Sequence, residues 1–202
     1  MGVYHGPKVR RSRRVGAPIA ETPKHTAKRN PSRPGVHGTG RRGRSTLYGT
    51  QLTEKQKLCF YYNIRDKQMR RYMANASRQP DTGRALVTIL ERRLDNVIRR
   101  LGWGRTIWQI RQLVSHGHFR VNGRKVDIPS FPVEPGDVIT MRERSRDRIK
   151  EIAATREELA LPDWLALDEA TMTGRVLRLP ALEDLRLPLE VDLAAVVEFY
   201  TR

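Results

Sequence analysis

The 202-residue chain has a single cysteine, Cys59, and no long run of hydrophobic residues. One cysteine excludes an internal disulfide framework and a zinc cluster built from thiolates, and it favours a reducing environment. No stretch approaches the roughly 18–20 consecutive apolar residues that a membrane span requires. The first residues lack the apolar core of a secretory signal and the amphipathic pattern of a transit peptide. We therefore expect a cytoplasmic protein.

Negative charge is also scarce. The chain has 22 Asp and Glu against 39 Lys and Arg, a formal net charge of +17. A surplus of this size predicts attraction to polyanions and says nothing about the fold. A basic surface can serve nucleic acid, an anionic membrane or solubility alone. In a small protein this basic we favour nucleic acid, because charge is the first sign of that class.

The positive charge is concentrated toward the N-terminus. The net charge is +11 in residues 1–44, +4 in 45–91, +7 in 92–155 and −5 in 156–202. We predict four corresponding parts: a basic arm, a helical domain, a helix-and-sheet module, and a C-terminal region that completes the core. The arm is rich in Gly, Pro and Arg, so by itself it should be disordered and should order on RNA. The alternative, a merely solubilising tail, would not need so many charges.

From residue 47 onward the pattern predicts a folded, largely helical region. A capping box, Thr53-x-x-Gln56, predicts a helix that begins at Thr53, because the hydroxyl and the amide can satisfy each other's free backbone donors. Asn63 is expected to end that helix. Apolar residues at helical spacing predict a second helix over 69–76.

A third helical pattern begins at Asp81 or Thr82, with a kink or split expected near Arg92. A second capping box, Thr106-x-x-Gln109, predicts a short helix that follows it. These two helical segments form a predicted helix–loop–helix.

Period two then replaces the helical period. Asn122-Gly123 is the strongest short hairpin signal, and Pro135-Gly136-Asp137 predicts a turn before a strand over 138–141. Beyond it we expect a helix over about 149–159 and short strands near 176–177 and 197–200. The predicted fold class is α+β, a helical domain plus a helix–loop–helix and small antiparallel sheet, with an extended basic N-terminal arm.

Polar residues without a core explanation cluster where the short helix meets the hairpin, with arginines on the preceding helix. They are Arg93, Arg99, Arg100, Arg111, Gln112, Ser115, His116 and Arg120. They are predicted to form a continuous basic, hydrogen-bonding face. Such a face suits the phosphates and 2′-hydroxyls of a folded RNA better than base edges in a DNA groove.

Several segments resemble a known family. Arg93-Leu94-Asp95-Asn96-Val97, residues 111–117, Val121-Asn122-Gly123 and Pro135-Gly136-Asp137 resemble the small RNA-binding module named after the fourth protein of the small ribosomal subunit. The likeness extends to Tyr4-x-Gly6-Pro7-Lys8, to Tyr48-Gly49-x-Gln51-Leu52 and to Val197-Glu198-Phe199-Tyr200. It covers nearly the whole chain in order, so the chain is identified as a member of the bacterial ribosomal family that founded the module.

The resemblance implies a structural constituent of the small ribosomal subunit, without catalytic activity or cofactor. It implies binding to small-subunit rRNA early in assembly of the subunit body. It also implies contacts with neighbouring ribosomal proteins, notably protein five, at an interface tied to decoding accuracy. Arg41, Arg42 and Arg44 match positions where mRNA enters the subunit. Some members carry a zinc site in the arm, which Cys59 alone cannot build. We expect no membrane partner and no small-molecule substrate.

The predicted RNA-binding residues are basic and polar side chains of the arm, the helical domain and the module. They are Lys8, Arg10, Arg11, Arg13, Arg14, His37, Arg41, Arg42, Arg44, Lys55, Lys57, Arg70, Arg71, Arg93, Arg99, Arg100, Arg111, Gln112, Ser115, His116, Arg120 and Asn122. No catalytic and no metal-binding residue is predicted.

Other interpretations use the same residues. Arg93-Leu94-Asp95 resembles the catalytic aspartate segment of pseudouridine synthases, but it lies in an amphipathic helix and the chain has no room for their catalytic domain. Asp95 is therefore predicted to pair with arginines. His116 and His118 are predicted to be RNA contacts or solvated rather than metal ligands. Trp103 and Trp108 either stack on bases or pack internally. The alternative function is a free RNA-handling factor, such as a ribosome-rescue or modification protein.

Overall fold

The computed structural model describes Tyr4 and residues 6–20, 32–36, 38, 46–154, 161–181 and 190–201. The chain divides into two compact units. The helical unit comprises residues 1–83 with 187–202, and the sheet unit comprises residues 84–186. His37, Arg41, Arg42 and Arg44 lie outside the described residues. No helix in the described part of the chain is both long and apolar enough to span a bilayer.

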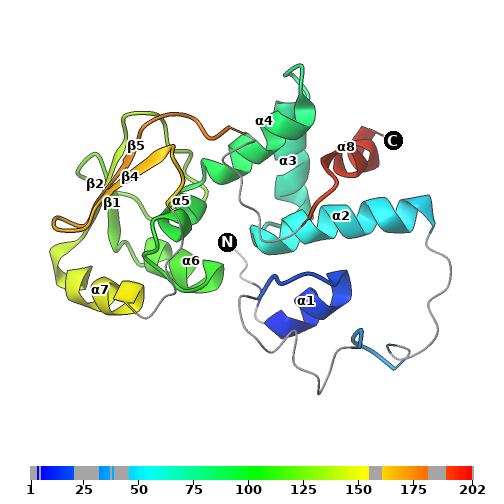
Figure 1. Ribbon diagram of the computed structural model, residues 1–202, viewed down its shortest axis with the longest axis horizontal. Coiled ribbons are helices and arrows are strands. Elements are labelled where there is room, and N and C mark those ends of the chain that lie inside the picture. The colour runs from blue at the N-terminus through cyan, green and yellow to red at the C-terminus, as the bar shows by residue number, and fades with distance from the viewer. Residues whose placement is uncertain are drawn as a thin grey trace. The chain divides into compact units, whose positions relative to one another are not determined.

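The helical unit is built around one long helix (Figure 1). Its elements are α1 (Lys8–Val15), α2 (Leu47–Tyr61), α3 (Asp66–Ala76) and α8 (Leu193–Thr201). Helix α2 contacts both α1 and α8, and α8 also contacts α3. The expected second helix is confirmed as α3, which buries Met69, Met73 and Ala76.

The start of the arm is folded, contrary to expectation. Helix α1 ends at Gly16, whose left-handed backbone (φ 69°) lets its N–H donate to the Ser12 carbonyl. The Ser12 hydroxyl then accepts a hydrogen bond from the Ala20 N–H at 2.9 Å. Val15, Ala17, Ile19 and Ala20 are buried. The prediction of a disordered arm is therefore wrong for residues 8–20. A few buried apolar residues at the end of a basic helix are enough to fix this segment to the fold. The average composition of residues 1–44 does not reveal them.

Replacing Ile19 by alanine is expected to lower the free energy of unfolding of the helical unit by about 2–4 kcal/mol. Ile19 is only 2% exposed, so the change removes buried methyl groups and leaves a cavity. Chemical denaturation followed by circular dichroism measures the loss. Val36→Ala is the control, because Val36 is 93% exposed. Equal stability of both variants would show that the segment after α1 contributes nothing to the core.

The expected helix start at Thr53 is wrong. Helix α2 begins at Leu47, and the Thr46 side chain caps it by accepting from the Gly49 N–H at 3.1 Å. Thr53 lies inside the helix and donates its hydroxyl proton to the Gly49 carbonyl. A threonine hydroxyl can make either bond, so its spacing alone does not locate a helix end. The expected end is confirmed: α2 stops at Tyr61, and Asn63 has a φ of 49°.

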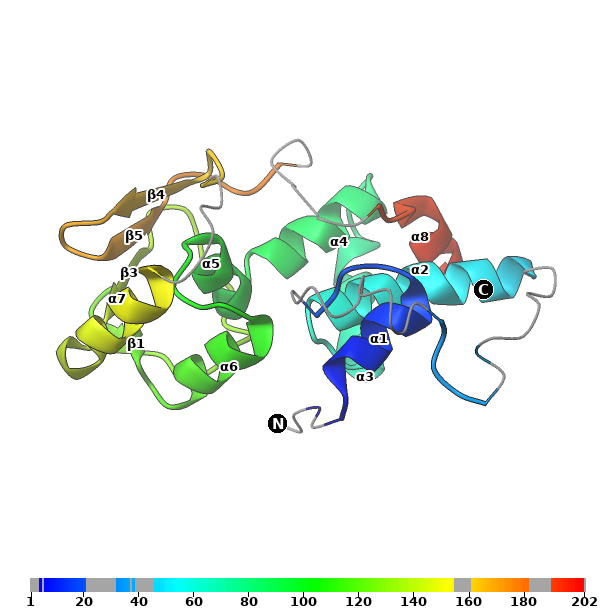
Figure 2. The same ribbon diagram turned by 60° about the horizontal axis from the view of Figure 1, so that its bottom comes forward.

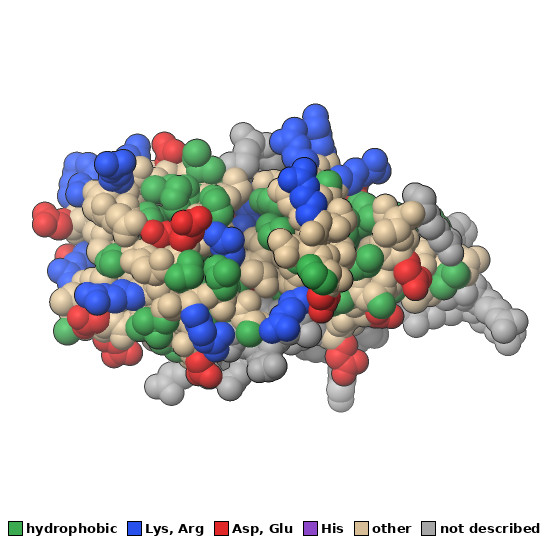
Figure 3. Space-filling model, turned by 90° about the horizontal axis from the view of Figure 1, so that it is seen from above, with side chains coloured by type: hydrophobic (Ala, Val, Ile, Leu, Met, Phe, Trp, Pro, Cys, Tyr) green, Lys and Arg blue, Asp and Glu red, His purple; other side chains and the backbone are tan. Residues whose placement is uncertain are grey.

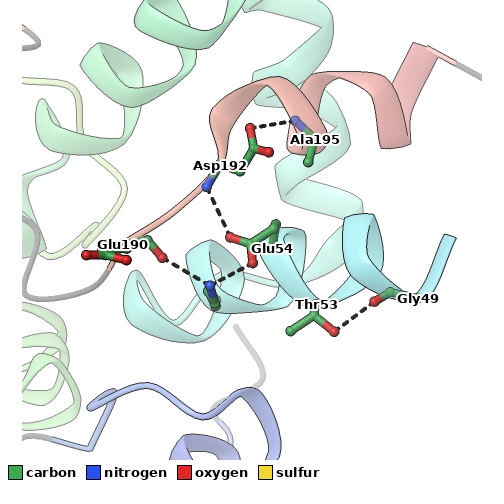
Figure 4. A network of polar contacts seen from close by, with 7 residues as sticks. Gly49, Thr53, Glu54, Glu190, Asp192 and Ala195 are labelled. Atoms are coloured by element: carbon green, nitrogen blue, oxygen red, sulfur yellow. Dashed lines mark hydrogen bonds and ion pairs between the residues drawn. The ribbon is translucent and has the colours of Figure 1, made fainter. Parts of the chain in front are cut away.

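The expected strand near 197–200 is also wrong, because these residues belong to helix α8. The run of valines and aromatic residues has strand propensity, but contacts with α2 override it. Asp192 begins the helix by accepting a hydrogen bond from the Ala195 N–H at 3.1 Å. The Asp192 N–H in turn donates to a Glu54 carboxylate oxygen of α2 at 3.1 Å (Figure 4). The start of α8 is thus fixed to the middle of α2.

The sheet unit combines helices with an antiparallel sheet, which confirms the α+β prediction (Figure 2). Its helices are α4 (Thr82–Glu91, which begins in the helical unit), α5 (Leu94–Arg100), α6 (Ile107–Ser115), the 3-10 helix η2 (Glu143–Ser145) and α7 (Arg146–Ala154). Its strands are β1 (Phe119–Val121), β2 (Arg124–Lys125), β3 (Val138–Met141), β4 (Leu165–Asp168) and β5 (Thr173–Val176). The strand order is β2-β1-β3-β5-β4.

Most predictions made from local sequence signals within this unit are confirmed. The third helical pattern splits between α4 and α5, as expected near Arg92. The Thr106 hydroxyl caps α6 by accepting from the Gln109 N–H at 3.3 Å. Asn122 and Gly123 both have positive φ, which the hairpin between β1 and β2 requires. Residues 155–159 of the helix expected over 149–159 lie outside the described residues.

The C-terminal region is shared between the two units. Strands β4 and β5 extend the sheet, and their Leu165 and Val176 enter its core. Helix α8 belongs to the helical unit instead. Trp103 and Phe119 stack in the core of the sheet unit with ring centroids 6.0 Å apart. Trp103 and Trp108 are 1% and 7% exposed, so both pack internally rather than present a face to bases.

Candidate nucleic-acid interface

A buried ion pair marks the start of α5. The Arg93 guanidinium donates to both carboxylate oxygens of Asp95, at 3.0 and 2.6 Å. Arg111 of α6 reaches the same carboxylate at 3.4 Å. Arg93 and Asp95 are 1% and 0% exposed. The prediction that Asp95 pairs with arginines is confirmed. Because the carboxylate is enclosed and bound on both oxygens, it has no access to a substrate.

A second buried cluster involves Arg100, at the end of α5. Arg100 donates to both carboxylate oxygens of the fully buried Glu91, at 3.0 and 2.8 Å. Asn96 donates to Glu91 as well. Arg99 is 4% exposed. We therefore leave these arginines out of the contact surface, because Arg93 and Arg100 pair with buried carboxylates and Arg99 is itself buried.

The exposed polar residues lie at the end of α6 and on β1. Helix α6 buries Ile107, Ile110, Leu113 and Val114, which leaves its other side to solvent. Gly117 (φ 71°) then turns the chain into β1. Gln112, Ser115, His116 and Arg120 are all exposed, and we call these four the α6–β1 surface. This part of the predicted face is brought together.

Asn122 has a structural role in the hairpin turn. Its side-chain amide donates to Asp137 at 2.7 Å, and its side-chain oxygen accepts from the Val138 N–H at 2.9 Å. Asp137 also accepts from the Glu134 N–H at 2.8 Å. Asn122 therefore joins the hairpin turn to the turn before β3, and we leave it out of the contact surface.

The sheet brings further cations beside Arg120, and sequence reasoning missed them. Arg120 lies opposite Lys125 of β2 and opposite Thr140 of β3. The Arg142 N–H donates to the His118 carbonyl at 2.9 Å, which continues the β1–β3 pairing by one step. Residues two apart on a strand share a face. His118, Arg120, Lys125 and Arg142 therefore share one sheet face. The period-two pattern around residue 119 could have indicated this.

In the helical unit, the half-buried Arg11 makes contacts within the fold. Its guanidinium lies 3.4 Å from the centroid of the Tyr4 ring and 4.8 Å from that of Phe60. It also donates to the Asn63 side chain at 3.2 Å. Burial lowers the pKa of Arg11, although Tyr4 opposes the shift. Lys8, Arg10 and Arg14 are exposed on α1, and Arg13 is half-buried.

The lysines of α2 make ion pairs within the unit. Lys55 lies 2.7 Å from Asp66, and its hydrogen bond lowers the pKa of that carboxyl. Lys57 lies 2.6 Å from Glu54 and also donates to the Glu190 carbonyl, on the path to α8 (Figure 4). Arg70 pairs with Asp66 too, but its side chain is 70% exposed. Arg70 and Arg71 thus remain on the surface of α3.

The described residues hold no cluster of three or more His, Cys, Asp or Glu that could bind a metal ion. Burial raises the pKa of the Cys59 thiol to about 12, so it stays protonated at neutral pH.

Positive charge does not cover the surface evenly. On the face drawn in Figure 3, Lys and Arg side chains alternate with Asp and Glu, and hydrophobic side chains lie between them. The net charge alone therefore does not locate an RNA-binding surface.

Comparisons with known proteins cover the whole chain. Residues 3–91 match the family described as ribosomal protein S4/S9 N-terminal domain, and residues 92–139 match the S4 domain. The small ribosomal subunit protein uS4 of Persephonella marina is 47% identical over 207 residues, and that of Aquifex aeolicus is 47% identical over 211. The uS4 protein of Rubrobacter xylanophilus is 44% identical over 204 residues. Each alignment covers 100% of both chains.

Proposed function

Because the chain belongs to the S4 family of small-subunit ribosomal proteins, we propose that it binds small-subunit rRNA through the α6–β1 surface and the exposed cations of α1. It is a structural, non-catalytic component of the ribosome, and it works in the cytoplasm. Neighbouring ribosomal proteins and the rRNA are its partners.

The observation that carries this proposal is that some polar residues of the sheet unit are buried in ion pairs while others are exposed together on one surface. Arg93 and Asp95 are used internally, whereas Gln112, Ser115 and His116 stand exposed beside Arg120. Amide, hydroxyl, imidazole and guanidinium groups together can bond to phosphate and 2′-hydroxyl oxygens. A rigid surface of this kind positions an RNA and needs no reactive group.

The finer roles rest on the family resemblance. We extend the proposal to early binding during assembly of the subunit body and to an interface with ribosomal protein five that affects decoding accuracy. Arg41, Arg42 and Arg44 would lie where mRNA enters the subunit.

Sedimentation of assembled subunits tests the proposed function. The tagged protein is expected to sediment with small subunits and to stay bound after a high-salt wash, because a built-in component is held by many contacts. A quadruple variant, Gln112→Ala, Ser115→Ala, His116→Ala and Arg120→Ala, should be incorporated less well. Leu47→Ala, at an exposed residue, is the control. Recovery of the wild type only in the free fraction would favour a free RNA-handling factor instead.

A further inference from the structure

The open face of the β1–β3 strands carries more positive charge than the α6–β1 surface alone. We call His118, Arg120, Lys125 and Arg142 the basic sheet face. Strand pairing places His118 opposite Arg142, and Arg120 opposite Lys125. Paired strands lie about 4.8 Å apart, so neighbouring side chains are within reach of one phosphate or of two consecutive ones.

His118 is held in a fixed position on this face. Its Nδ1 atom lies 2.6 Å from the Ser145 hydroxyl of η2. Ser145 is itself buried, so the bond ties the histidine to the fold. The other ring nitrogen, Nε2, points away from that bond. The His116 ring lies 6.2 Å from the His118 ring.

The ionisable groups that act on the pKa of His118 are basic. Burial lowers the pKa of His118, and His116, Arg148 and Arg142 lower it further. Arg148 comes from α7, which lies beside the β1–β3 end of the sheet (Figures 1 and 2). Lys125 lies over Gly117, where a Cβ atom would be 3.1 Å from its Nζ. Basic side chains thus converge on one corner from the end of α6, from β2, from the residue after β3 and from α7.

Acidic residues hardly offset this charge. Within the described residues, Lys125 alone in this set has an acidic partner. That partner is Asp127 at 3.9 Å, and both side chains are more than half exposed. Arg120, Arg142 and Arg148 are exposed. Like charges held together without acids repel one another, and a bound polyanion removes that repulsion.

We infer that the basic sheet face and Arg148 form a second binding site for the sugar–phosphate backbone of the rRNA, which meets the α6–β1 surface at the shared residue Arg120. This inference rests on the proposed function and names a further part of the interface. The rRNA would then contact the module along the end of α6, across the strands and onto α7. Arg142 and Arg148 would each neutralise a phosphate, and His118 would donate from Nε2.

Two pairs of variants in the full chain test the site. Arg142→Gln and Arg148→Gln each remove a charge from it. Arg144→Gln in η2 and Lys150→Gln in α7 each remove the same charge from an exposed residue two positions further along the chain. Affinity for a small-subunit rRNA transcript is measured at several salt concentrations, and circular dichroism verifies the fold. Arg142→Gln and Arg148→Gln should each weaken binding about tenfold. Each should also reduce the salt slope by about one.

The four variants separate a defined site from general charge. Equal losses in all four, or wild-type affinity in Arg142→Gln and Arg148→Gln, would overturn the second site while leaving the proposed function intact. A wild-type protein that fails to bind the transcript would overturn the proposed function itself. A second readout is the His118 ring in NMR titrations. Its pKa should rise when the transcript binds, because a phosphate stabilises the imidazolium. An unchanged pKa in the complex would contradict the assignment of His118.

Discussion

Replacement of Asp95 by alanine is expected to destabilise the sheet unit by about 3–5 kcal/mol. The change leaves the Arg93 guanidinium buried without its carboxylate partner, and a buried unpaired charge is one of the most destabilising defects in a protein. Arg93 is 1% exposed, so water cannot replace the lost bonds without opening the fold. Urea denaturation followed by circular dichroism or tryptophan fluorescence measures the effect.

Asp147→Ala supplies the matched control, because Asp147 is an exposed aspartate of the same unit. It should change stability by less than about 0.5 kcal/mol. A double variant, Arg93→Met with Asp95→Leu, should recover much of the loss, since two apolar side chains can replace a buried ion pair. If Asp95→Ala were as stable as the wild type, the pair would not hold α5 in place. RNA binding by the Asp95→Ala variant should fail only to the extent that the unit unfolds.

Affinity for small-subunit rRNA is expected to fall by about 10³–10⁵ between roughly 50 and 200 mM salt. This is the loss that follows when about 6–10 phosphates are neutralised, because each contact releases condensed counterions. The exposed cations of α1, the α6–β1 surface and the basic sheet face can together supply that number. Filter binding or fluorescence anisotropy with the transcript, at fixed pH, measures the slope.

An unrelated RNA of equal length is the control for this measurement. It should show a comparable slope at lower affinity, because phosphate contacts carry no sequence information. An affinity for the transcript that stayed flat across this salt range would contradict binding through phosphates. It would favour binding through the apolar surface of the protein.

Local patterns predicted the sheet unit well for identifiable reasons. The split at Arg92, the cap at Thr106 and the hairpin at Asn122 depend on neighbouring residues, so their signals lie within short stretches of sequence. Arg93 could not be assigned in this way. An arginine that reaches RNA and one that reaches a buried aspartate look the same until the fold shows which surfaces are covered.

The helical unit was predicted less well because its contacts join distant parts of the chain. Nothing near Val197 in the sequence shows that α2 will lie beside it. The strand propensity of these residues therefore led to the prediction of a strand where a helix forms. Nothing near Ile19 shows that a core is available for it. In both cases an average over the local sequence pointed away from a contact that only the tertiary structure provides.

The docking of α8 on α2 has a consequence for the order in which the chain folds during synthesis. Residues 84–186 form the sheet unit as one continuous segment, whereas the helical unit needs residues on both sides of it. A unit built from two separated parts of the chain cannot complete its structure until the second part has been translated. The sheet unit can therefore fold first. Helix α2 gains its contacts with α8 only after the whole sheet unit has been translated. The nascent chain would then carry a folded sheet unit, with its RNA-binding surface, while residues 1–83 still lack their contacts with α8.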